Sequence, residues 1–225
     1  MRFSFWQILF AIVGSVVFAD DDLEESTAIK KIELLGGKVE RHENHPGRPV
    51  LRVSLGAGHK RFNDTHIFLL KDFKGLTSLN LTGSSVTDVG LREVTNFTAL
   101  DTLVLGQTNI TGTGLKQMRD LKALRILYLG ETQLTDEGLK GLAEIRTLNY
   151  LFLNATKVTD AGLKEISGLK NLKSLSLGGN RITDGGLKHL TALTNLKSLY
   201  LNQTQTTDLG VGELQKALPN LVINR

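Results

Sequence analysis

The hydrophobic positions of this chain repeat with a period of 24 residues. In each repeat, a leucine is followed by two more at the third and fifth positions after it, as at Leu76, Leu79 and Leu81. The alternation between residues 76 and 81 predicts a short strand with one apolar face. Such a fixed period predicts an elongated solenoid, in which each repeat packs against its neighbours. The leucines that open the repeats are Leu76, Leu100, Leu124, Leu148, Leu172 and Leu196.

The second half of most repeats carries the phrase Thr-Asp-x-Gly-Leu, as at residues 87–91, whereas one repeat has Gly112 in place of the aspartate. Apolar residues follow three and six positions later, here Val94 and Phe97, and this spacing predicts a helix. The aspartate lies where a carboxylate can accept free backbone N–H groups, so we expect it to cap the helix that follows. The aspartates concerned are Asp88, Asp136, Asp160, Asp184 and Asp208.

Between strand and helix, one position of the turn carries a hydroxyl or an amide. We expect these side chains to satisfy backbone groups inside the turn. They are Ser84, Thr108, Thr132, Thr156, Asn180 and Thr204.

The segment before the regular repeats has a different pattern. Ile29, Ile32 and Leu35 recur at helical spacing before Gly36-Gly37, which predicts a short capping helix. Residues 38–41 and 50–55 then predict two strands joined by a turn. The second strand lies two residues too early for the period, so we expect a two-residue insertion near residues 58–61.

With these phrases in view, the chain resembles secreted leucine-rich repeat proteins of environmental bacteria such as planctomycetes. The resemblance extends from Ala28 to the end of the chain, and residues 28–31, 35–39 and 218–220 look like the ends of that group's repeat domains. It implies an α/β fold, a right-handed horseshoe with a parallel concave sheet, convex helices, and an N-terminal cap of helix plus hairpin. It also implies protein or glycan binding in general, and it transfers no catalytic residue.

The chain divides into three predicted parts: a signal peptide at 1–19, the cap at 20–52, and a solenoid of about seven repeats at 53–225. Arg2, the apolar run that follows it, and small residues up to Ala19 predict export with cleavage after Ala19. An uncleaved membrane anchor is the alternative, but the apolar run of 16 residues is short for a span. We therefore expect a secreted or periplasmic protein without a membrane span after cleavage.

The composition and the motifs narrow the range of partners, metal sites and enzymatic activities that we expect for this chain. Lys and Arg number 27 against 23 Asp and Glu, and they form no dense basic block, so nucleic acid is not an expected partner. Cysteine is absent, which excludes disulfides and thiolate metal sites. His42, Glu43 and His45, with His59 and His66 nearby, show no recognised zinc spacing, and we expect no metal and no cofactor. No phosphate-binding loop or nucleophile motif is present, so we expect no enzymatic activity.

The side chains that flank the middle strand leucine should face the concave surface. Large apolar residues gather there in the central repeats, at Ile126, Tyr128, Tyr150 and Phe152. Such residues are typical of binding hot spots. The alternative is that cross-strand aromatic neighbours only stabilise the sheet. The predicted ligand-binding set adds a polar rim and an outlying tyrosine: Glu131, Asn154 and Tyr200.

The sequence therefore predicts a secreted, non-enzymatic module that recognises a protein or cell-surface ligand through its concave face, and the expected partner is a protein or a glycan. One alternative is a structural cell-envelope protein that self-associates through its C-terminal end, and another is an effector or substrate-receptor-like adaptor. A basic stripe on the convex helices is typical of a solubilising surface, although it could also meet an anionic polymer. The stripe comprises Arg92, Lys116, Lys140, Lys164 and Lys188.

Overall fold

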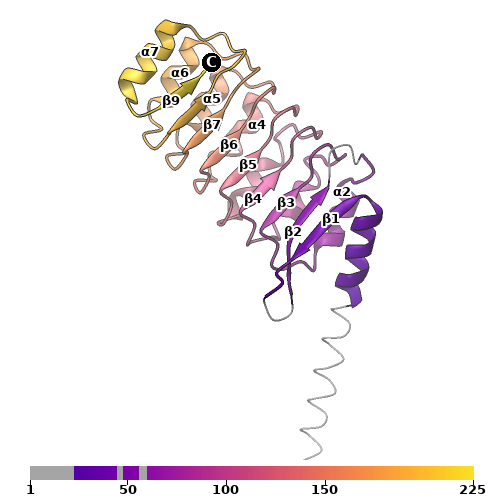
Figure 1. The fold of residues 1–225 in the computed structure, drawn as a ribbon. Helices are drawn as coiled ribbons and strands as arrows, with labels where there is room; N and C mark the ends of the chain where they lie inside the picture. The colour runs from indigo at the N-terminus through magenta and orange to yellow at the C-terminus, as the bar shows by residue number, and fades with distance from the viewer. Residues whose placement is uncertain (1–22, 45–47, 56–59) are drawn as a thin grey trace, which may run out of the picture.

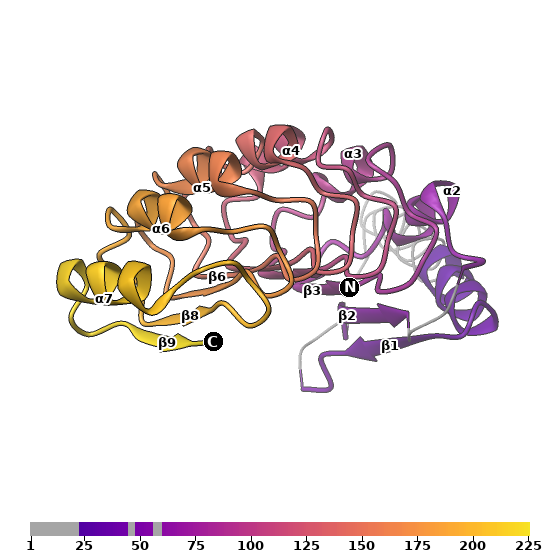
Figure 2. The same cartoon turned by 90° about the horizontal axis from the view of Figure 1, so that it is seen from above.

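One continuous sheet runs the length of the molecule. The computed structural model describes residues 23–44, 48–55 and 60–225, and within them nine strands form a sheet whose order follows the chain. Every strand pair except the first is parallel. Helical segments cover the outer, convex side and leave the inner face of the curved sheet open (Figures 1 and 2). The predicted α/β solenoid is confirmed, whereas the predicted signal peptide lies outside the described residues.

A helix and a hairpin form the N-terminal end, as predicted. Residues 23–34 are helical, and Gly36 ends this segment with a left-handed φ of 86°. Strand β1 (Gly37–Arg41) then pairs antiparallel with β2 (Val50–Leu55). Gly37 is required for the close packing of the helix against the hairpin, because a Cβ there would lie 2.5 Å from the Ile32 side chain. The hairpin places β2 beside the first regular strand.

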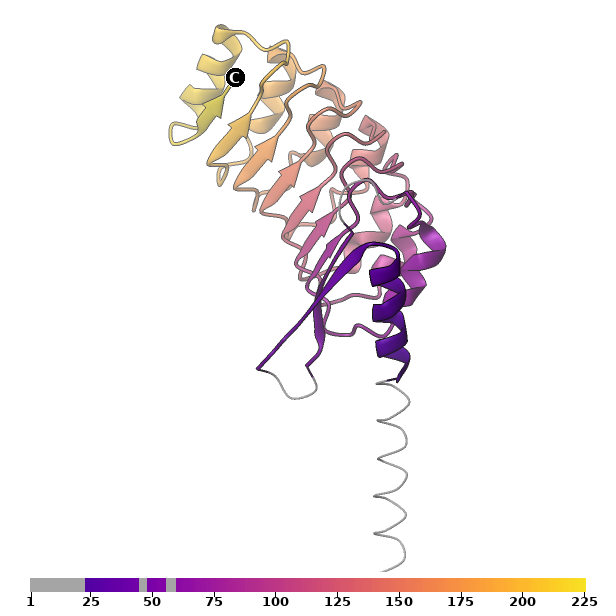
Figure 3. The same ribbon diagram turned by 45° about the vertical axis from the view of Figure 1, so that its right-hand side comes forward.

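Three-residue strands line the concave face of the regular repeats, side by side in Figure 3. Leu127 pairs with Leu151 and Leu151 with Leu175, so equivalent leucines stack in columns that are fully buried. Shortening one of them, as in Leu127→Ala, should cost about 2–5 kcal/mol, because a cavity remains in a packed layer. The strands are β3 (Ser78–Asn80), β4 (Thr102–Val104), β5 (Ile126–Tyr128), β6 (Tyr150–Phe152), β7 (Ser174–Ser176), β8 (Ser198–Tyr200) and β9 (Val222–Asn224).

The helices on the convex side lengthen along the chain, from four residues in α2 to ten in α7. They are α2 (Asp64–Ile67), α3 (Leu91–Val94), α4 (Asp136–Lys140), α5 (Asp160–Ile166), α6 (Asp184–Leu190) and α7 (Asp208–Ala217), with 3₁₀ segments η1 (Phe68–Leu70) and η2 (Leu115–Asp120). The repeat that contains η2 has Gly112 in place of aspartate, and η2 begins without a side-chain cap. The apolar residues Leu115, Met118 and Leu121 recur every three residues in this repeat, and this spacing suits a 3₁₀ helix as well as an α-helix.

The first repeat contains two extra residues, as predicted. Val53 pairs with Leu79, 26 residues later, whereas Leu79 pairs with Leu103 after 24. The bridge from Asn63 to Ser85 already has the same spacing as the later bridge from Thr135 to Lys157. The insertion therefore lies between Leu55 and Asn63, and half of the predicted position, residues 58 and 59, is outside the described residues.

The expectation that the aspartates cap their own helices is wrong. In α4 to α7 the caps are threonines: the hydroxyl of Thr183, for example, accepts the backbone N–H of Gly185 at the start of α6. Helix α2 is capped by Asn63, and α3 has no side-chain cap. Asp160 instead accepts hydrogen bonds from Thr183 of the following repeat, 2.9 Å from its backbone N and 2.5 Å from its hydroxyl. Asp136, Asp160 and Asp184 lie in the first turn of their helices, and Asp88 lies in the turn before α3. The carboxylate of each bonds across the repeat boundary. We call this contact the inter-repeat link.

The glycine of the Thr-Asp-x-Gly-Leu phrase makes room for the inter-repeat link. A Cβ on Gly186 would lie 2.2 Å from the Asp160 carboxylate, and one on Gly210 would lie 2.2 Å from that of Asp184. The glycine of one repeat thus lies against the aspartate of the repeat before it. The threonine and the glycine of one phrase therefore contact the aspartate of the phrase before it.

Most of the predicted turn ladder is confirmed. Thr108, Thr132 and Thr156 donate their hydroxyls to the carbonyl oxygen three residues earlier, and Thr204 does the same to Leu201. Asn180 donates to the carbonyls of Leu153 and Leu177. Ser84 is the exception, because its buried hydroxyl has no hydrogen-bond partner.

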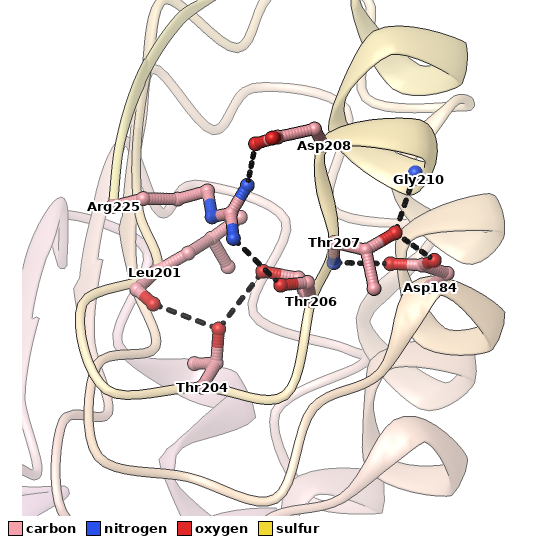
Figure 4. A network of polar contacts seen from close by, with 8 residues as sticks. All are labelled: Asp184, Leu201, Thr204, Thr206, Thr207, Asp208, Gly210 and Arg225. Carbon is pink, nitrogen blue, oxygen red and sulfur yellow. Dashed lines mark hydrogen bonds and ion pairs between the residues drawn. The ribbon is translucent and has the colours of Figure 1, made fainter.

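A different contact holds the aspartate of the last repeat. Asp208 forms an ion pair with Arg225, which also donates a hydrogen bond to the carbonyl of Thr206 (Figure 4). The preceding link, from Thr207 to Asp184, lies beside it in the same view. Arg225, which directly follows strand β9, is thereby joined to the start of α7. In the part of the chain described by the structure, no helix is long and apolar enough to cross a membrane.

Candidate binding surface

Two adjacent strands bring the predicted apolar residues together on the concave face. Ile126 pairs with Tyr150, and Tyr128 pairs with Phe152, so the four side chains form two neighbouring rows on β5 and β6. The leucines between them point the other way, into the core. We refer to Ile126, Tyr128, Tyr150 and Phe152 as the central cluster.

Within the central cluster, Tyr128 and Phe152 stack face to face. Their ring centroids are 4.0 Å apart and their planes differ by 1°. Both rings are half-buried. The pair forms a flat aromatic surface across two strands.

Tyr150 is the most exposed member of the central cluster. Its exposed fraction is 38%, whereas Ile126, Tyr128 and Phe152 are only partly exposed. The ring of Tyr150 is therefore accessible from the concave side.

Polar groups lie in the turns that follow the strands of the cluster. Glu131 has a left-handed φ of 58°, and its carboxylate accepts a hydrogen bond of 3.0 Å from Gln107. The backbone N–H of Glu131 donates to the carbonyl of Asn154. The predicted rim residues Glu131 and Asn154 therefore occupy adjacent turns. Gln107 was not predicted, although it lies 24 residues before Glu131 and the period could have indicated it.

Tyr200 lies apart from the central cluster. It is as exposed as Tyr150, at 38%, but it belongs to β8, and Ser176 of β7 stands between it and Phe152. Adjacent strands are about 4.8 Å apart, which separates the two aromatic positions by roughly 10 Å. The structure thus divides the predicted site residues into a compact group and one outlying tyrosine.

In the described residues, no group of three or more His, Cys, Asp or Glu side chains is placed to hold a metal ion. His45 and His59 lie outside that part of the chain. The imidazole of His66 contacts the backbone N–H and the side chain of Asn63, which completes the start of α2. What the concave face offers is apolar contact area with hydrogen-bonding groups at its border.

Comparisons with known proteins agree with this architecture. A family model described as leucine-rich repeats in two copies matches residues 170–220, and a single leucine-rich repeat model matches residues 76–94 and 122–143. The chain has the leucine-rich repeat solenoid fold. Proteins with this fold commonly use the extended concave surface for protein binding. A search among curated proteins finds no match.

Solved structures of bacterial leucine-rich repeat proteins share the fold. Internalin C2 of Listeria monocytogenes is 23% identical, with a TM-score of 0.59, and the match covers 78% of this chain and 80% of that one. Another internalin of the same organism is 22% identical, with a TM-score of 0.56 over 69% of this chain and 49% of its own. A Leptospira interrogans leucine-rich repeat protein is 25% identical, with a TM-score of 0.57 over 70% and 39%. The match thus spans less than half of the length of the second internalin and of the Leptospira protein.

Proposed function

We propose that the chain is a secreted, non-enzymatic binding module that recognises a protein through the central cluster on its concave face. The observation that carries this proposal is the exposed Tyr150 beside the stacked rings of Tyr128 and Phe152. Aromatic residues contribute large contact areas and are enriched among the residues that dominate binding energy.

The sheet itself does not require these large side chains. At the same register as Ile126 and Tyr150, the neighbouring strands carry Thr102, Ser174 and Ser198, and the parallel pairing continues unchanged. Small residues therefore suffice for this position of the fold. This contrast favours recognition over sheet stabilisation as the reason for the aromatic residues in β5 and β6.

The surroundings of the central cluster suit a protein ligand. An apolar side chain of the partner can lie on the Tyr128–Phe152 stack, while its amide or basic groups can donate to Glu131 at the border. A neutral glycan is the alternative, because the face of a sugar ring can also stack on an aromatic side chain. The same side chains of the central cluster would bind either ligand, so the chemical nature of the captured partner distinguishes a protein ligand from a glycan.

The test compares two tyrosines of equal exposure on the same face. The protein is used to capture partners from an envelope extract of the producing cell, and the affinity of the identified partner is then measured. Tyr150→Ala should weaken binding by about 2 kcal/mol or more, as expected for a hot-spot residue, whereas Tyr200→Ala should change it little. Equal losses for the two variants, or no loss for Tyr150→Ala, would refute the central cluster as the binding site. A captured partner whose binding is abolished by deglycosylation would assign the site to a glycan.

Export is part of the proposal and has its own test. It rests on the N-terminal segment, where a basic residue, an apolar run and small residues precede Asp20. The mass of the protein recovered from the envelope or the medium should correspond to a chain that begins at Asp20. A full-length mass in the membrane fraction would indicate an uncleaved anchor instead.

Self-association is a second candidate function. Leu209 and Val222 are 72% and 60% exposed, and β9, which contains Val222, forms one edge of the sheet. An exposed strand edge with apolar side chains can pair with another chain. Light scattering should then show oligomers that grow with concentration and are lost in Val222→Lys. A monomer at all concentrations would exclude this function.

A further inference from the structure

A polar groove lies along the edge of the sheet where strands β5 to β8 begin, and neither the central cluster nor its polar rim contributes to it. Its volume is about 450 Å³. Residues from four consecutive repeats form its walls: Arg125, Thr147, Asn149, Asn171, Lys173, Asn195 and Lys197. We call it the strand-entry groove.

Three cations line the strand-entry groove without a counter-charge. Arg125, Lys173 and Lys197 are exposed, none of them belongs to an ion pair within the described residues, and no acidic residue is among the lining. Each directly precedes a strand, at β5, β7 and β8. With strands about 4.8 Å apart, Lys173 and Lys197 are one strand spacing apart, and Arg125 lies roughly 10 Å from Lys173. The charges thus form a row whose length fits a short linear polyanion.

The asparagines between these cations are held with their amide NH₂ groups turned toward the protein. Asn171 donates to the carbonyl of Arg146 at 2.7 Å, Asn195 to that of Lys170 at 2.8 Å, and Asn149 to that of Asn171 at 3.1 Å. Their Oδ1 atoms accept no hydrogen bond from the described residues. The groove therefore offers fixed hydrogen-bond acceptors between its cations.

We propose that the strand-entry groove binds an acidic polysaccharide. The acid groups of the polysaccharide lie at Arg125, Lys173 and Lys197. Its sugar hydroxyls donate to the free amide oxygens of Asn149, Asn171 and Asn195. A polymer with regularly spaced acid groups and many hydroxyls matches both features. Single-stranded nucleic acid fits less well, because no aromatic residue lines the groove to stack on a base.

The experiment uses an oligogalacturonate as the probe and its methyl ester as the uncharged control, titrated by calorimetry at low salt. The double variant Lys173→Gln, Lys197→Gln should bind the acidic probe about tenfold more weakly than the wild type. The matched control is Lys164→Gln, Lys188→Gln, which removes the same charge from the exposed convex helices and should lower the affinity less than about twofold. The methyl ester should bind to none of the proteins.

Several results would overturn the proposal: no binding of the acidic probe, equal losses in the two double variants, or equal binding of the methyl ester. Tighter binding of a thymidine oligonucleotide that also depends on Lys173 and Lys197 would assign the groove to nucleic acid instead. Tyr150→Ala should bind the probe like the wild type, so this test is independent of the central cluster. All substituted lysines are exposed, and unchanged melting temperatures will confirm that the variants fold.

Discussion

The carboxylate of Asp160 is bonded to Thr183, which lies 23 residues further along the chain, through both the backbone N–H and the hydroxyl of that threonine. The same inter-repeat link recurs between other aspartates and threonines at this spacing, as from Asp64 to Thr87 and from Asp136 to Thr159. Each link joins two neighbouring repeats on the convex side, opposite the strand pairing. The solenoid is thus held by hydrogen bonds on both of its faces.

The inter-repeat link makes the aspartates unequal in their contribution to stability. Asp160→Ala should lower the free energy of unfolding by about 1–3 kcal/mol, because it removes two hydrogen bonds to a charged group. Asp208→Ala is the matched control, since Asp208 also begins a helix but pairs with Arg225 at the surface, and it should cost less than about 1 kcal/mol. Denaturant titrations measure both. Equal losses of stability in the two variants would mean that each aspartate stabilises the start of its own helix and that the link contributes nothing.

Gly186 should resist replacement although alanine favours helices. Gly186→Ala should destabilise the protein by about 1–3 kcal/mol, because the added Cβ would displace the Asp160 carboxylate. Gly212 is also helical, but a Cβ added there would meet no atom within 4 Å, so Gly212→Ala should stabilise by about 0.5–1 kcal/mol. Melting temperatures that move in opposite directions would support the link, and a rise for both variants would contradict it.

Gly112 interrupts the series of inter-repeat links, and restoring the repeat phrase there should be harmful. Thr135, the would-be partner, bonds instead to the carbonyl of Thr111 at 3.4 Å. Gly112 has a φ of 104°, and a Cβ would lie 2.5 Å from the Cα of Gly138. Gly112→Asp should therefore lower the stability by about 1–3 kcal/mol, measured by thermal melting. A rise in melting temperature would show that the backbone rearranges to form the missing link.

The inter-repeat link should also make stability depend on pH in the acid range. Burial raises the pKa of Asp88, but hydrogen bonds from Gly114, Thr111 and Gly112 outweigh it, and the pKa lies below its ordinary value of 3.8. The hydroxyl and backbone N–H of Thr207 are the main cause of the lowered pKa of Asp184. A carboxyl whose pKa is lowered by folding stabilises the protein above its unfolded pKa, and this contribution is lost as pH falls through the folded value.

The melting temperature of the wild type should accordingly fall from about pH 4 downward. Asp88→Asn should be less stable than the wild type at neutral pH, and the difference should shrink as the pH decreases, because protonation removes the same charge. Melting curves of the two proteins at a series of pH values measure this. A difference that stays constant down to about pH 2 would mean that the charge of Asp88 contributes nothing.

The stacked rings of Tyr128 and Phe152 should be energetically coupled. A double-mutant cycle with Tyr128→Leu and Phe152→Leu should give a coupling free energy of about 0.5–1.5 kcal/mol in denaturant titrations. Tyr150 and Phe152 neighbour each other along one strand with Leu151 between them, and the cycle Tyr150→Leu, Phe152→Leu is the control. Similar coupling in both cycles would mean that the face-to-face geometry is not the source.

Much of this protein is determined by the sequence alone. The period predicts the leucine columns, the threonine turns and the alternation of strand and helix, because these depend on a local spacing that recurs along the chain. The two extra residues before Asn63 are also predicted, because they are a departure from that spacing. The gathering of Ile126, Tyr128, Tyr150 and Phe152 also follows, since a parallel sheet at constant register places equivalent positions side by side.

Only the tertiary structure decided where the aspartates bond. An aspartate at a helix start has two sets of donors within reach, those of its own helix and those of the next repeat, and the sequence pattern is the same for both. The distance between repeats selects the second set, and it also sets Tyr200 apart from the central cluster and aligns Arg125, Lys173 and Lys197 along one groove. Local periodicity specifies the elements of the solenoid, whereas contacts between repeats depend on how closely these elements stack.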